Sequence, residues 1–300
     1  MIYTLTFSPA IDYVIDLKKL EIGAINRSES EHMMPGGKGI NVSIVLSNLG
    51  KESVATGFMG GFTGEYVKKE LKAKNIHSDF IEVEGNTRIN VKIRGEEETA
   101  INGQGPRISK DHIEALISKL EKLGKGDLLV ISGTIPSSLP DDIYQRILSR
   151  IDGNGAELIV DTNKTILLNT LKYHPLLVKP NKEELEEMFE TKISTDGELI
   201  ENAEKLLKLG AKNVIVSLGG DGALLVGEGI SPILLPAPKG KVVNTVGAGD
   251  SLVAGFIDEY MNSGNIAKAF RRGIATGSAS AFSEGLASKE EVEALLNKMA

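Results

Sequence analysis

The chain has 300 residues, of which 41% are hydrophobic and 25% charged, and its formal net charge is -7. That length suffices for a sizeable core in one large α/β domain or two modest ones, and the acidic balance argues against general binding to nucleic acids or anionic membranes. The chain contains no cysteine, which excludes disulfides, zinc–thiolate sites and a cysteine nucleophile. No uncharged run reaches the roughly 18 residues of a membrane span, so we expect a cytoplasmic protein.

The first third of the chain contains two segments that do not fit a helix–strand alternation. Residues 1–6 alternate like a strand, whereas the segments 12–34 and 87–102 break the pattern. Within the second segment, 89–93 and 99–101 predict short strands around a charged turn. We expect a small separate sheet that acts as a lid over a site or as a subunit contact, and the periodicity leaves both open.

From Ser109 onward, helical and strand periods alternate regularly. Ser109 is placed to cap a helix that ends at Gly124, and the rest of the chain continues in the same way. Such alternation indicates βαβ units and a mostly parallel sheet covered on both faces, with ligands at the carboxyl ends of the strands. The predicted strands are 127–132, 158–161, 176–179, 214–217 and 223–226, and the predicted helices are 141–150, 167–171, 183–189 and 199–207. Ser132, Asp161, Lys179, Asn181 and the turn 217–222 fall at strand ends.

The stretch 244–251, Asn-Thr-Val-Gly-Ala-Gly-Asp-Ser, carries the strongest chemical signal. Gly247, Ala248 and Gly249 leave backbone N–H groups accessible at the start of a predicted helix, which suits phosphate oxygens. Asp250 would stand beside the transferred group and accept a proton from an attacking hydroxyl. The plainer alternative is that Asp250 only caps the helix.

Residues 36–41, Gly-Gly-Lys-Gly-Ile-Asn, combine glycines with a cation and an amide before an apolar, helix-like run. Gly37 permits close approach of a ligand to the backbone, while Lys38 and Asn41 suit sugar hydroxyls or a sugar phosphate. A tight turn with a surface lysine is the alternative. The Walker P-loop pattern does not occur in the chain.

Residues 217–222 superficially resemble a dinucleotide fingerprint, but a strand follows where that fingerprint requires a helix. We therefore interpret Ser217, Gly219, Gly220 and Gly222 as a nucleotide-lining turn or as a plain hairpin connection.

Asn181 and Glu184 lie about one helical turn apart and together suit a hard cation or its water ligands. A solvated helix face is the alternative for Glu184. Arg88 has a guanidinium suited to phosphate, or is a strand-edge charge, and Asp12 suits sugar hydroxyls or ends a turn.

Taken together, these motifs resemble those of the ribokinase-like PfkB sugar kinases over essentially the whole chain. Residues 35–41 are similar to the family's N-terminal signature and 244–251 to its C-terminal one, with Asn181 and Glu184 between them. The resemblance implies an α/β fold, a ribokinase-like three-layer αβα sandwich in a single domain over 1–300. Its lid would comprise approximately 12–34 and 87–102, and the chain would form a homodimer through that β lid.

The resemblance also implies roles for individual residues. Asp250 would be the base, with Gly247, Ala248 and Gly249 as the anion hole. Asn181 and Glu184 would organise Mg²⁺ through water. The sugar phosphate would be held by Asp12, Gly37, Lys38, Asn41, Arg88, Asn90 and Ser132, and ATP by Lys179, Asn181, Ser217, Gly219, Gly220, Gly222, Ala275 and Gly277.

Within the family, residues 87–92 together with 36–41 are similar to the bacterial 1-phosphofructokinase group. The expected reaction is therefore ATP-dependent phosphorylation of the 6-hydroxyl of fructose 1-phosphate to fructose 1,6-bisphosphate, in fructose metabolism. Alternatives are a tagatose-6-phosphate kinase or a 6-phosphofructokinase of the same family, a non-catalytic sugar-phosphate sensor, and a dehydrogenase, for which residues 217–222 offer no support. Asn90 or Lys92 would decide between the sugars.

Overall fold

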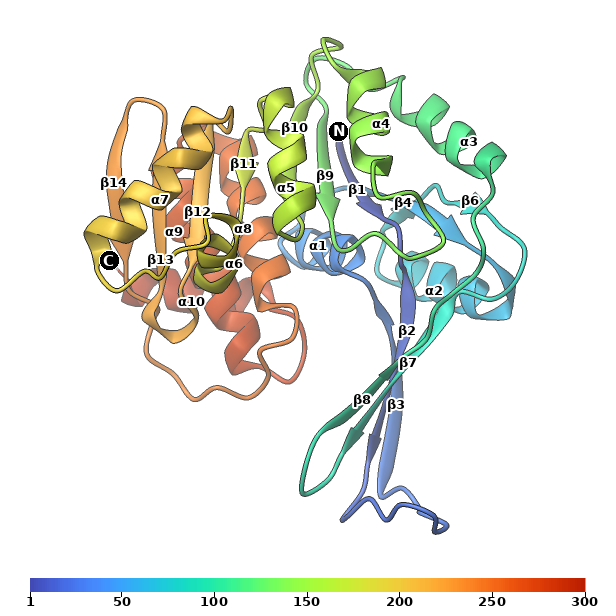
Figure 1. Cartoon of the computed structure of the whole chain (residues 1–300). Helices are drawn as coiled ribbons and strands as arrows, with labels where there is room; N and C mark the ends of the chain where they lie inside the picture. Colours follow the sequence, from blue (N-terminus) through green and yellow to red (C-terminus); the bar gives the residue numbers. More distant parts are fainter. Residues whose placement is uncertain (300) are drawn as a thin grey trace.

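The computed structural model describes residues 1–299 and contains a ten-stranded central sheet and a separate four-stranded one (Figure 1). The central sheet has the order β14-β13-β12-β11-β10-β9-β1-β4-β5, with β6 beside β4. Pairing is parallel from β4 to β12 and antiparallel from β12 to β14. Its strands are β1 (Ile2–Thr6), β4 (Val54–Met59), β5 (His77–Ser78), β6 (Ile81–Glu82), β9 (Leu128–Ser132), β10 (Glu157–Asp161), β11 (Leu177–Val178), β12 (Asn213–Ser217), β13 (Ala223–Gly227) and β14 (Ile230–Leu235).

Helices cover both faces of this sheet, as the continuous apolar strands require. On one face lie α3 (Lys110–Leu120), α4 (Ile143–Ile151), α5 (Lys164–Thr170), α6 (Lys182–Met188) and α7 (Asp196–Lys208). On the other lie α1 (Lys38–Asn48), α8 (Ala248–Ser263), α9 (Ile266–Phe282) and α10 (Lys289–Lys298), while α2 (Gly61–Ala73) packs near β4.

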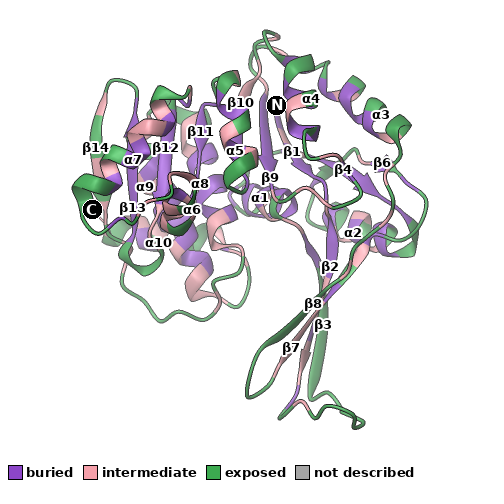
Figure 2. Ribbon diagram, viewed as in Figure 1, coloured by how far each residue is buried: buried purple, intermediate pink, exposed green. Residues whose placement is uncertain are grey.

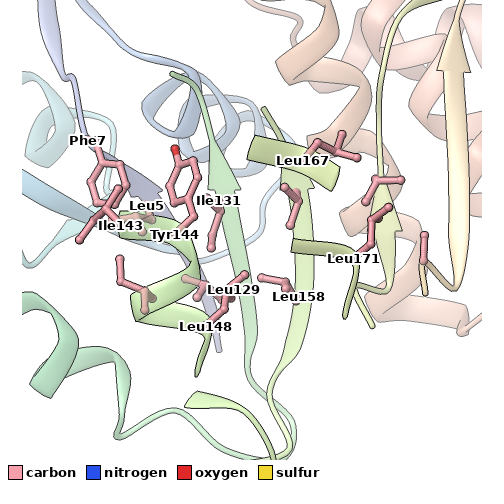
Figure 3. Packing of buried hydrophobic residues seen from close by; sticks show 14 of the residues in the cluster. Leu5, Phe7, Leu129, Ile131, Ile143, Tyr144, Leu148, Leu158, Leu167 and Leu171 are labelled. Carbon is pink, nitrogen blue, oxygen red and sulfur yellow. The ribbon is translucent and has the colours of Figure 1, made fainter. Parts of the chain in front are cut away.

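Strand alternation divides the core into two clusters. In β9, Leu129 and Ile131 belong to the cluster shown in Figure 3, whereas Leu128 and Val130 belong to the cluster under α1 and α8. Successive side chains of a strand point to opposite faces, so one buried strand supplies both layers. The predicted three-layer αβα sandwich with a mostly parallel sheet is confirmed.

The second sheet is an arm that projects away from the body and is largely exposed (Figures 1 and 2). Its order is β3-β2-β7-β8, with β2 (Ala10–Asp16), β3 (Ser30–Gly36), β7 (Arg88–Arg94) and β8 (Thr99–Asn102). The predicted small separate sheet from segments 12–34 and 87–102 is therefore confirmed.

The turn at 217–222 joins two antiparallel strands through a short 3-10 helix, Gly219–Asp221. No α-helix follows β12 directly, so the turn lacks the element that a dinucleotide fingerprint needs. A second 3-10 helix, Leu171–Tyr173, extends α5. Within residues 1–299, no helix is long and apolar enough to cross a membrane.

Candidate active site

Asp250 lies in the first turn of α8, whose N-terminus opens without a side-chain cap. Gly247 is the N-cap residue, with φ 81, a left-handed conformation that glycine adopts without strain. Because the N-cap is Gly247, Asp250 is not the capping residue. The Ala248 amide donates to the Thr245 carbonyl oxygen at 3.2 Å. Within residues 1–299, no acceptor is found for the amides of Gly249 and Asp250, which therefore offer free donors to an anion.

The Asp250 carboxylate is buried, with 5% of the residue exposed. Burial, followed by the nearby charge of Asp161, raises the pKa of Asp250 from 3.8 to about 7. The Asn41 Nδ2 donates to Asp250 Oδ2 at 2.8 Å and, with the ammonium groups of Lys38 and Lys179, opposes that rise in pKa. A carboxylate with a pKa near neutrality suits general base catalysis.

Asp161 at the end of β10 pairs with two lysines. Its carboxylate lies 3.2 Å from Lys179 Nζ and 3.6 Å from Lys38 Nζ. Burial alone would raise the pKa of Asp161, but the charges of Lys179 and then Lys38 outweigh burial and lower it. Asp161 in turn raises the pKa of Lys38. Two cations therefore stand close to the carboxylates of Asp161 and Asp250.

Gly249 explains how Lys179 fits beside those amides. A Cβ on Gly249 would lie 3.2 Å from Lys179 Nζ, tighter than an ordinary contact. Sequence reasoning placed Asp161 at a strand end but gave it no role. The available signal was its position at a strand end, like Ser132 at the end of β9 and Lys179 directly after β11, the two strands that flank β10.

A cavity of about 330 Å³ lies directly against Asp250. All of the residues predicted to hold a sugar phosphate line it, together with Gly247: Asp12, Gly37, Lys38, Asn41, Arg88, Asn90 and Ser132. Lys92, which sequence reasoning had named as a possible discriminator between sugars, also lines it. Sequence reasoning missed further lining residues: Thr6, Ser8, Asn102, Gly133, Thr134 and Val246.

The cavity collects buried polar atoms that have no partner. Within residues 1–299, five buried side-chain polar atoms make no hydrogen bond, and four of them belong to residues lining this cavity: Thr6 Oγ1, Arg88 Nε, Asn90 Oδ1 and Ser132 Oγ. Since buried polar groups are usually paired, this concentration indicates a site shaped for a polar ligand. Burial lowers the pKa of Arg88, which a nearby Asp12 opposes.

The arm supplies one wall of the cavity. Asp12 on β2 lies opposite Asn90 on β7, and its carboxylate accepts from Asn90 Nδ2 at 2.9 Å and Lys92 Nζ at 3.1 Å. A Cβ on Gly36 would lie 2.7 Å from Asp12 Cγ, so a side chain there would displace this carboxylate. The arm and the body must therefore be correctly placed for the cavity to form.

Asn181 and Glu184 form the capping box of α6. Glu184 N donates to Asn181 Oδ1 at 2.7 Å, and Asn181 N donates to Glu184 Oε2 at 2.9 Å. Residues 1–299 contain no cluster of three acidic or histidine ligands for a metal. One carboxylate with a spare oxygen fits Mg²⁺ that keeps its waters and binds mainly to phosphates, but not an all-protein cage.

A second cavity, of about 700 Å³, includes Asn181, Ser217 and Gly219 in its lining. Gly220 lies exposed in the same turn. Gly222 has φ 104, and a Cβ on it would lie 2.0 Å from the Leu235 carbonyl oxygen, so its lack of a side chain serves packing against β14.

Ala275 and Gly277 are not brought to either cavity. Both are buried in α9, where Ala275 belongs to the core and a Cβ on Gly277 would lie 2.9 Å from the Ala248 carbonyl oxygen. Their small size is explained by the close packing of α9 against its neighbours, with Gly277 lying directly against α8.

Comparison with known proteins gives matches over nearly the whole chain. The family described as pfkB family carbohydrate kinase matches residues 5–293. The 1-phosphofructokinase of Bacillus subtilis (strain 168) is 46% identical, covering 99% of this chain and 97% of that protein. The D-tagatose-1-phosphate kinase of Bacillus licheniformis is 40% identical, covering 95% and 94%. The structure of phosphofructokinase-2 from Escherichia coli in complex with substrates and products is 29% identical, with a TM-score of 0.94, and covers 99% of both chains.

Proposed function

The chain belongs to the pfkB family of carbohydrate kinases, with a ribokinase-like fold, and we propose that its reaction is phosphorylation of the 6-hydroxyl of fructose 1-phosphate by ATP. The bond between the γ-phosphorus and the ADP oxygen breaks, a bond from phosphorus to the sugar O6 forms, and the hydroxyl proton passes to the protein. The products are fructose 1,6-bisphosphate and ADP. Identity of 46% to a 1-phosphofructokinase over nearly the whole chain supports this substrate.

The observation that carries the proposal is the buried Asp250 at the mouth of the uncapped helix α8, beside the 330 Å³ cavity. With a pKa of about 7, about half of the carboxylate is ionised at neutral pH, so it can both accept a proton and hold it. The free amides of Gly249 and Asp250, with Lys179, are placed to offset charge on the migrating phosphoryl group.

Magnesium, held by the nucleotide phosphates and by water on Glu184, would neutralise phosphate charge when bound. We assign Asn181 to orienting Glu184 through the capping box, because both of their cross-bonds are made. The turn that begins at Ser217 is assigned to the nucleotide, since Ser217, Leu218 and Gly219 line the 700 Å³ cavity beside Asn181.

On the sugar side, the unpartnered Nε of Arg88 favours a phosphate, and the Asp12 carboxylate favours sugar hydroxyls. Lys38 is engaged with Asp161, and Asn41 with Asp250, so we assign both to the reacting end of the cavity rather than to the sugar phosphate.

A tagatose phosphate is the second candidate substrate, because a D-tagatose-1-phosphate kinase is 40% identical to this chain. A single changed stereocentre is discriminated by a few side chains in the cavity, so overall identity alone does not decide between the sugars. A coupled assay of ADP production over fructose 1-phosphate, tagatose 1-phosphate, fructose 6-phosphate and tagatose 6-phosphate compares kcat/KM directly. The highest value for another phosphosugar would overturn the fructose 1-phosphate assignment.

The base assignment has its own test. The Asp250→Asn variant should lower kcat by at least roughly 100-fold with little change in nucleotide affinity, since it keeps the shape of the side chain and removes the proton acceptor. Near-normal turnover would rule the assignment out. Tight sugar-phosphate binding by the wild-type protein without ADP production would favour a sensor.

We also propose a homodimer through the arm. Directly paired residues place Tyr13, Met33, Val91 and Ile101 on one face, opposite to that of Asp12, and Ile101 remains 58% exposed. An apolar face of this kind on a projecting sheet suits a second copy of the chain. Sedimentation of Ile101→Glu should show monomers, with Leu209→Glu, an exposed apolar residue on the body, as the control. An unchanged dimer, or a monomeric wild-type protein, would contradict the proposal.

A further inference from the structure

The helices α8 and α9 approach each other unusually closely behind the active-site turn. A Cβ on Gly255 would lie 2.2 Å from Thr276 Oγ1, and one on Gly277 would lie 2.9 Å from the Ala248 carbonyl oxygen. Glycines at both places therefore let α9 lie directly against the first residues of α8. This contact brings the Ser280 hydroxyl within 2.7 Å of the Ser251 hydroxyl.

A continuous chain of hydrogen bonds passes through these two serines. The Ala287 amide donates to Ser280 Oγ at 2.9 Å, Ser280 Oγ donates to Ser251 Oγ at 2.7 Å, and Ser251 Oγ donates to the Gly247 carbonyl oxygen at 2.8 Å. Ser251 and Ser280 are 0% and 1% exposed. The backbone amide can only donate, so the direction of the chain is consistent from the α9–α10 loop to the active-site turn.

We infer that Ser251 and Ser280 are positioning residues for phosphoryl transfer, which hold the Gly247 turn so that the amides of Gly249 and Asp250 face the migrating group. The inference rests on the proposed role of that turn as the anion site. The Gly247 carbonyl oxygen accepts hydrogen bonds from both the backbone amide and the side chain of Ser251. These two hydrogen bonds fix the orientation of the Gly247 peptide plane.

The α9–α10 loop also packs against the Gly247 turn through the side chain of Leu286. A Cβ on Gly247 would lie 2.7 Å from Leu286 Cδ2, and Leu286 directly precedes Ala287. Removing the Ser280 hydroxyl leaves the Ala287 amide buried without an acceptor, so the loop must shift to regain one. Leu286 then moves with it, and the turn loses its support on that side.

The experiment compares Ser280→Ala and Ser251→Ala with Ser53→Ala. Ser53 is a matched control, because it is also buried and donates to another serine, Ser43, at 2.8 Å, but it precedes β4 at the edge of the sheet opposite to the active site. Ser280→Ala and Ser251→Ala should each lower kcat by roughly 10- to 100-fold, since a displacement of about 1 Å has such an effect on rate. The KM values for ATP and phosphosugar should change less than about threefold. The double variant should lose no more than the worse single variant, because the two serines act as one unit.

Kinetics are measured with whichever phosphosugar the wild-type protein turns over best, so failure of the fructose 1-phosphate assignment leaves this test intact. Amide hydrogen exchange in the ligand-free protein is the second readout. We expect faster exchange in peptides covering 245–252 in Ser280→Ala and Ser251→Ala, but not in Ser53→Ala. Loss of kcat equal to that of Ser53→Ala, multiplying losses in the double variant, or unchanged exchange at 245–252 would overturn the inference.

Discussion

Replacing Asn41 by leucine removes the amide that donates to Asp250 Oδ2 at 2.8 Å, while it keeps a side chain of similar size. That hydrogen bond lowers the pKa of Asp250, which burial has raised to about 7, so its loss raises the pKa further. A hydrogen bond to a charged group is worth about 1.5–3 kcal/mol, which corresponds to a shift of about one to two pH units.

The base acts in its ionised form, so kcat/KM should rise with pH through the pKa of Asp250. In Asn41→Leu the rising limb should therefore move about one to two units to higher pH, with a loss of roughly 5- to 50-fold at pH 7 that shrinks as the pH increases. The assay is kcat/KM for the phosphosugar between pH 5 and 10.

Asn90→Leu is the matched control, since Asn90 lines the same cavity but bonds to Asp12 rather than to Asp250. It should weaken kcat/KM equally at every pH. A pH-independent loss in Asn41→Leu, or a limb displaced to lower pH, would refute the account of how the carboxylate is tuned.

Three further predictions test the charges at the site. In Asp250→Asn, the free energy of unfolding at pH 8 should exceed that of the wild type by roughly 2–4 kcal/mol. In the wild type, folding raises the pKa of Asp250 from 3.8 to about 7, so ionisation of this carboxylate destabilises the folded protein as the pH rises between those values. Thermal unfolding should show the gain shrinking toward pH 5, and an equal gain at both pH values would contradict the prediction. Gly249→Val should displace Lys179 Nζ, which lies 3.2 Å from the Cβ position, and lower kcat by about 100-fold or more without unfolding the protein; a kcat within about threefold of wild type would show that this approach is unimportant. Arg88→Met should raise KM for the phosphosugar by roughly 10- to 100-fold and leave KM for ATP unchanged, and equal effects on both substrates would argue against a sugar-phosphate contact.

Local patterns in the sequence were sufficient for the layered fold and for much of the site. Helix caps such as Ser109 and strand runs such as 128–132 act over a few residues, so their signals survive without tertiary information. The Gly-rich turn before Asp250 likewise reports a local need for bare amides and a left-handed residue at Gly247.

The tertiary structure decided which partners these residues meet. Asn41 and Asp250 are 209 positions apart, and only packing of α1 beside α8 joins them. Asp161 gained its role in the same way, from two lysines on other elements. Gly277 shows the converse, because the family resemblance implied a nucleotide contact for it, whereas it lies against the Ala248 carbonyl. Most of the helices and strands from Ser109 to Val226 could be predicted from the sequence, since propensity and periodicity are local. Burial, charge neighbours and the resulting pKa values depend on long-range contacts, so they follow only from the folded chain.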